Sequence, residues 1–142
     1  MTYEEWLAII EKLKSRNINR ELLDQITNNQ PPTIDRALPK VLEMIDYRFD
    51  LSVKNMINNL EEMFSDENML DMYMVNFKKE ILFLNDLCHL PMLPSDTKRA
   101  YMIKLKTESD RVYDIIEKEA DNEDYTGYLR QLIKYNRIKW SE

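Results

Sequence analysis

The chain has 142 residues, 44% of them hydrophobic and 32% charged, with a formal net charge of −6 at pH 7. This length and composition suit one globular domain with a sizeable core, and the negative charge argues against non-specific binding to nucleic acid or anionic membrane. The single glycine excludes glycine-rich phosphate loops and disfavours β-hairpins, because both need residues with positive φ. These totals already favour an all-α fold.

Compartment is predicted from the cysteine content and the N-terminus. One cysteine cannot form an intramolecular disulfide, which suits a reducing compartment. The opening MTYEEWLAII places acidic residues before its apolar run, whereas a signal peptide starts basic and has a longer apolar core. No apolar run approaches the roughly 20 residues that span a bilayer. We therefore expect a complete, soluble, cytoplasmic protein that does not bind membranes.

Two short helices are predicted in the N-terminal part. Over 3–15, Thr2 and Glu5 match a capping box, and a second helix over about 20–27 follows the cap candidate Asn19. The second helix, RELLDQIT, carries acidic residues that oppose insertion into the major groove of DNA. The apolar face of the first helix consists of Trp6, Leu7, Ile10 and Leu13.

The first long helix is predicted over about 39–64. Pro39 suits its first position, where the missing N–H of proline costs no hydrogen bond. Apolar residues then recur at steps of three or four, which predicts one buried face. That face consists of Leu38, Leu42, Ile45, Phe49, Val53, Met56, Leu60 and Met63.

The second long helix is predicted near 66–89, with Ser65 as its N-cap. Its apolar stripe is widened by further apolar residues, and a stripe this wide predicts burial against more than one neighbour. The stripe consists of Leu70, Met74, Phe77, Ile81, Leu84 and Cys88, and it is widened by Val75, Leu82, Phe83, Leu87 and Leu90.

The third long helix is predicted over about 96–121, with Ser95 as its N-cap. A last helix begins near 128 and continues towards Trp140, with Leu129, Leu132 and Ile133 among its apolar residues. The face of the third helix consists of Met102, Leu105, Ser109, Val112, Ile116 and Ala120.

These elements predict an all-α fold. Long helices with short connections pack antiparallel to their neighbours in the chain. We expect a compact antiparallel bundle of five or six helices, three of them long, in a single domain over 1–142. Within it, a helix pair at 1–30 accompanies the main bundle at 39–140.

The stretch NDLCHLPMLPSD, residues 85–96, holds the only cysteine and the only histidine of the chain. Cys88 lies on the apolar stripe, which predicts a buried thiol that acts as a small hydrophobe. His89 falls in the last helical turn, where the helix dipole favours positive charge. Adjacent helical residues point about 100° apart, so the two side chains do not face each other. The stretch is interpreted as a helix end.

Neither catalysis nor a cofactor is predicted. One histidine and one cysteine cannot supply a di-iron bundle site or a zinc site. The acidic run at 117–124 lacks the spacing of an EF-hand loop. No nucleophile elbow, phosphate loop or dinucleotide fingerprint is present. We therefore expect no enzymatic activity, no metal and no cofactor.

Three residues near the start of the second long helix form a candidate apolar binding patch. Methionine occurs in irregular cores and on adaptable binding grooves alike. Most methionines of the chain fit core stripes, but Met69, Met72 and Tyr73 spread around their helix and cannot all face one neighbour. If exposed together, they mark a protein-binding patch.

Charges near the C-terminus separate into an acidic run and a basic run. A candidate acidic docking face consists of Glu117, Glu119, Asp121 and Asp124. The following segment interleaves cations with aromatic residues, a pattern that holds single-stranded nucleic acid. The interpretation we prefer is that the basic helix lies on its acidic neighbour. The candidate nucleic-acid set consists of Arg130, Lys134, Arg137, Lys139 and Trp140.

The leading functional hypothesis is a small acidic protein-interaction module, such as a regulator, an adaptor or an inhibitor. It binds and occludes a protein partner, with an acidic rim that steers a basic surface and an apolar centre that supplies affinity. The alternative is a nucleic-acid-associated protein that uses the basic C-terminal helix. The sequence leaves open whether the apolar faces close within one chain or across a homodimer.

Overall fold

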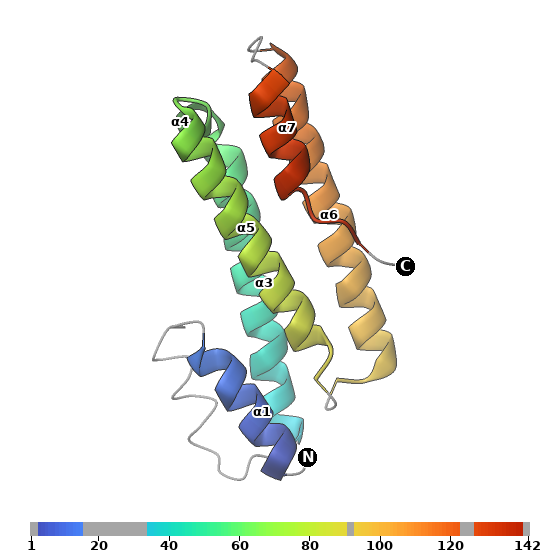
Figure 1. Ribbon diagram of the computed structural model, residues 1–142. Helices are drawn as coiled ribbons and strands as arrows, with labels where there is room; N and C mark the ends of the chain where they lie inside the picture. Colours follow the sequence, from blue (N-terminus) through green and yellow to red (C-terminus); the bar gives the residue numbers. More distant parts are fainter. Residues whose placement is uncertain (1–2, 16–33, 91–92, 123–126, 141–142) are drawn as a thin grey trace.

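The computed structural model describes residues 3–15, 34–90, 93–122 and 127–140, and Figure 1 shows the arrangement of their helices. Helices α3, α5, α6 and α7 lie alongside one another, each antiparallel to the next in the chain, which confirms the predicted all-α bundle. The expected helix at 20–27 lies outside the described residues. The helices are α1 (Tyr3–Lys14), α3 (Ile34–Asn58), α4 (Leu60–Met63), α5 (Glu67–Cys88), α6 (Ser95–Asn122) and α7 (Gly127–Asn136).

Helix α5 is the centre of the bundle, because it packs against α3, α4, α6 and α7. The ring of Phe77 meets that of Tyr113 on α6 edge-on, with 5.5 Å between the centroids. Of the residues expected to widen the stripe, Leu82 is exposed, so α5 keeps a solvent-facing side. The predicted central stripe is buried throughout: Leu70, Met74, Phe77, Ile81, Leu84 and Cys88.

Helix α3 begins earlier than the sequence pattern indicates. It starts at Ile34, so Pro39 lies inside the helix, and the prediction that Pro39 is its first residue is wrong. Proline cannot donate to the carbonyl four residues earlier, which weakens the turn before it. Leu38 packs against the core, and this tertiary contact supports that turn.

The same helix ends earlier than predicted, at Asn58 rather than near Phe64. The Asn59 side-chain amide donates to the Asn55 carbonyl at 2.7 Å, in competition with the backbone N–H that would continue the helix. Helix α4 then adds one turn, which begins with the 2.8 Å bond from the Met63 N–H to the Asn59 carbonyl. The break turns the chain into α5.

The N-cap of α5 is Asp66, and the prediction of Ser65 is wrong. Asp66 is extended (φ −158°, ψ 168°), and its carboxylate accepts a hydrogen bond from the Met69 N–H at 2.8 Å. The Ser65 hydroxyl instead donates to the Glu62 carbonyl at 2.6 Å. A carboxylate at this position satisfies a free N–H and also favours the positive end of the helix dipole.

We expect Asp66→Ala to destabilise the protein by about 1 kcal/mol, because it leaves the first turn of α5 uncapped. Ser65→Ala is the neighbouring control and should change the free energy of unfolding by less than about 0.5 kcal/mol. Urea unfolding followed by circular dichroism measures both. Equal losses in the two variants would show that Asp66 is not the cap that matters.

The C-terminal part completes the bundle. On α6, Leu105, Val112 and Ile116 are buried as predicted. Helix α7 ends at Asn136, whose side-chain amide donates to the Leu132 carbonyl at 3.0 Å. The chain then leaves the helix and runs beside α6, as Figure 1 shows. Among the described residues, no helix combines the length and the apolarity needed to cross a membrane.

Candidate interaction groove

The cysteine and the histidine have separate environments. Cys88 is buried, and this burial raises the pKa of its thiol to about 11, with a smaller opposing effect from Lys98. His89 is exposed and caps the C-terminus of α5, and its Nδ1 lies 2.8 Å from the Asn85 carbonyl oxygen. The predicted buried cysteine at a helix end is therefore confirmed.

We expect the Cys88 thiol to resist a disulfide reagent such as dithiobis(nitrobenzoate) in the native protein at pH 8. The nucleophile is the thiolate, and burial suppresses both its formation and its access. Labelling should become rapid and stoichiometric in concentrated urea. Rapid stoichiometric labelling without denaturant would contradict the buried placement.

The acidic and basic runs near the C-terminus lie against each other. Arg137, just after α7, forms ion pairs with three carboxylates of α6: Asp110 at 3.6 Å, Asp114 at 3.0 Å and Glu117 at 3.2 Å. At the other end of α7, Arg130 pairs with Asp121 at 3.4 Å. The structure thus confirms that the basic helix lies on its acidic neighbour.

Arg137 is the most enclosed of these cations. Its side chain is 27% exposed, and its guanidinium carbon lies 5.5 Å from the centroid of the Tyr113 ring. Burial lowers the pKa of Arg137, but hydrogen bonds to Asp114 and Glu117 raise it, and the net effect is upward. Arg137 therefore stays charged and fastens the end of α7 to α6.

We expect Arg137→Gln to destabilise the protein by about 1–2 kcal/mol, because it removes several charge-assisted hydrogen bonds and the contact with Tyr113. Arg111→Gln is the matched control. Arg111 pairs with Glu108, three residues earlier on the same helix, and its side chain is more exposed than that of Arg137. Such an exposed pair contributes about 0–1 kcal/mol to stability. Urea unfolding at low salt measures the difference, and equal losses would refute the fastening role.

The remaining candidates of the two charged sets are scattered. Glu119 is partly buried, while Lys134 and Lys139 are exposed. Trp140 packs against the core. Asp124 lies outside the described residues. Two cations of the nucleic-acid set therefore face the protein's own carboxylates, and the set does not form one continuous surface in the described part of the chain.

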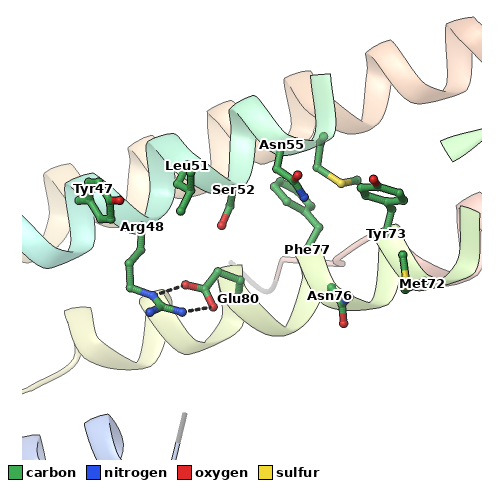
Figure 2. Close-up of a pocket in the computed structure, with 11 residues that line it drawn as sticks. Tyr47, Arg48, Leu51, Ser52, Asn55, Met72, Tyr73, Asn76, Phe77 and Glu80 are labelled. Atoms are coloured by element: carbon green, nitrogen blue, oxygen red, sulfur yellow. Dashed lines mark hydrogen bonds and ion pairs between the residues drawn. The ribbon is translucent and has the colours of Figure 1, made fainter. Parts of the chain in front are cut away.

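A groove of about 540 Å³ lies between α3 and α5, and Figure 2 shows the residues that line it. Three large apolar side chains on its two walls are exposed: Tyr47 (65%), Leu51 (54%) and Met72 (45%). Met56 and Phe77 also line it and are buried. The other lining residues are Arg48, Ser52, Asn55, Tyr73, Asn76 and Glu80.

One ion pair crosses this groove. The Arg48 guanidinium donates two hydrogen bonds to the Glu80 carboxylate, one of them 3.0 Å from Nη2 to Oε2. The two side chains are only 25% and 14% exposed. Such a bidentate pair has a fixed geometry, so it sets the spacing of α3 and α5 at one end of the groove (Figure 2).

The structure brings two of the three predicted patch residues into the groove. Met72 and Tyr73 line it, and the Tyr73 hydroxyl donates to Glu62 at 3.1 Å. Met69 is partly buried. Sequence reasoning missed Tyr47 and Leu51, although their spacing of four residues on the polar side of α3 was a usable signal.

The negative charge of the chain is concentrated in the segment from α3 to α5, mainly between the end of α3 and the first turns of α5. Residues 34–88, which span α3 to α5, contain six lysines and arginines against eleven aspartates and glutamates. Residues 89–142 contain ten of each kind. The net charge of residues 34–88 is therefore −5, to which α3 contributes 0, α5 contributes −2, and Glu61, Glu62 and Asp66 between these helices contribute −3. Five acids cluster near its Met72 end: Glu61, Glu62, Asp66, Glu67 and Asp71.

The described residues contain no group of three or more histidine, cysteine, aspartate or glutamate side chains arranged to hold a metal ion.

Comparisons of this chain with protein-family models, with curated proteins and with solved structures found no match.

Proposed function

We propose that this protein is a small acidic interaction module that binds a basic amphipathic helix of a partner protein in the α3–α5 groove. Binding would cover that helix and so block its contacts with other molecules. The observation that carries the proposal is the exposure of Tyr47, Leu51 and Met72 along one groove. Large apolar side chains gathered in this way are typical of protein-binding surfaces.

The shape of the groove suits a helix. Its walls are two antiparallel helices, with lining residues from Tyr47 to Met56 on α3 and from Met72 to Glu80 on α5. At 1.5 Å per residue, each wall extends about 12–14 Å, which corresponds to two or more turns of a bound helix. A helix in such a groove anchors itself through apolar residues at positions i, i+3 or i+4, and i+7.

The acidic residues near the Met72 end of the groove suit a basic helix, whereas the charged residues in its lining, Arg48 and Glu80, pair with each other. The acidic surplus of α3 to α5 attracts cations and raises the rate of association with them. Glu67 and Asp71 are exposed beside Met72. The acidic run on α6 is a weaker candidate for the same task, because Glu117 and Asp121 already pair with Arg137 and Arg130. The cationic end of the partner should therefore lie over the Met72 end.

The proposal is tested by selecting displayed random peptides of about 16 residues, a length that forms about four helical turns. We expect the enriched peptides to be basic, with apolar residues at helical spacing. Leu51→Asn combined with Met72→Asn should weaken their binding by at least about tenfold, because it removes the apolar anchors without changing the charge. Fluorescence anisotropy measures the affinities.

Leu82→Asn is the matched control, since Leu82 is an exposed leucine on α5 that does not line the groove. It should leave the affinities within about twofold. Enriched peptides that are acidic, or that bind the double variant as well as the wild type, would refute the proposal. If the wild-type chain dimerises and the double variant does not, the groove would instead be assigned to a second copy of the chain.

A further inference from the structure

A second cleft, of about 440 Å³, lies at the other end of α5. Its lining comes from Asn85 on α5, from the first turns of α6 beginning at Ser95, and from Trp140 in the segment after α7. The volume falls in the range of about 300–1,000 Å³ that is typical of small-molecule sites. The two sites share none of the lining residues that the structure describes.

The cleft is cationic although the protein is acidic. Lys98, Arg99 and Lys106 line it, and none of the other lining residues that the structure describes has a carboxylate. Residues 97–107 contain four basic side chains and no acidic one. Within the described part of the chain, none of the three lining cations forms an ion pair. Their charge is therefore available to a ligand.

The same cleft offers an apolar surface. Ile103 is 59% exposed, and Met102 and Trp140 are partly buried beside it. A thioether and an indole ring adapt well to aliphatic or aromatic ligand groups. An apolar surface surrounded by three cations matches a ligand that has an apolar body and an anionic head.

Two lining residues also keep unmet hydrogen-bonding capacity. The Trp140 Nε1 and the Asn85 Oδ1 are buried and have no hydrogen-bond partner in the described structure. Buried polar groups without a partner are rare in native proteins and call for an explanation. Both atoms are shielded from solvent, so they lie beneath the surface of the cleft.

We propose that this cleft binds a small organic anion with an apolar body, of the class of medium-chain carboxylates. The apolar chain lies against Ile103, Met102 and the Trp140 indole. The carboxylate is attracted by Lys98 and Arg99 near the start of α6 and by Lys106 about two turns further along the same helix. This site is independent of the proposed peptide groove.

The test is a titration with decanoate, followed by the fluorescence of Trp140 in a Trp6→Phe background and by calorimetry. We expect saturable binding with one site per chain. Decanol and decyltrimethylammonium should bind at least about tenfold more weakly, because they lack the charge that the three cations recognise. Leu51→Asn with Met72→Asn should leave decanoate binding unchanged. The anion site can therefore be tested independently of the proposed peptide groove.

Lys98→Gln combined with Lys106→Gln should weaken decanoate binding by at least about tenfold while leaving decanol binding unchanged. Lys79→Gln, an exposed lysine of α5 outside the cleft, is the matched control and should have no such effect. Equal affinities for decanoate and decanol, or no effect of the double variant, would overturn the anion site. Binding to vesicles of phosphatidylserine without binding of monomeric decanoate would also overturn it and assign the cations to a lipid surface.

Discussion

Burial of the apolar stripe on α5 is the constraint on which the other contacts depend. Each large side chain of that stripe contributes about 1.5–3 kcal/mol when it leaves water, and α5 presents them to α3, α6 and α7 together. A helix buried on so many sides cannot rotate without exposing one of these contacts. The positions of Met72 and Glu80 in the groove, and of Asn85 in the cleft, follow from that fixed orientation.

Charged residues have two different roles in this helical bundle. In the C-terminal half, Arg137 and Arg130 are used internally, because each faces carboxylates of α6. In α3 to α5, the surplus of acids over bases is not balanced within the segment. Residues 89–142 are balanced in charge, whereas residues 34–88 have five more acids than bases, with Glu61, Glu62 and Asp66 in the stretch between α3 and α5. This separation is what makes the groove, rather than the 117–124 run, the stronger candidate for a basic partner.

Periodicity was enough to predict the bundle and the buried side of α5, because apolar residues at steps of three and four share one face of a helix, and that face is stable when it is buried. It did not predict the ends of the helices. Pro39 was expected to begin a helix, yet core packing at Leu38 extends α3 past it. At the break, the Asn59 side-chain amide donates to the carbonyl and to the side-chain oxygen of Asn55, contacts that no periodic pattern encodes.

The groove was predictable only in part, for a related reason. Met72 and Tyr73 stood out because they lie off the core stripe of their own helix, but a groove needs two walls. Its second wall, Tyr47 and Leu51, comes from a helix whose rotation relative to α5 depends on the packed core and on the Arg48–Glu80 pair. Sequence spacing shows which residues share a face, whereas packing decides which faces meet. Because α5 contributes Met72 and Glu80 to the groove and Asn85 to the cleft, its buried stripe fixes the position of both sites on one helix.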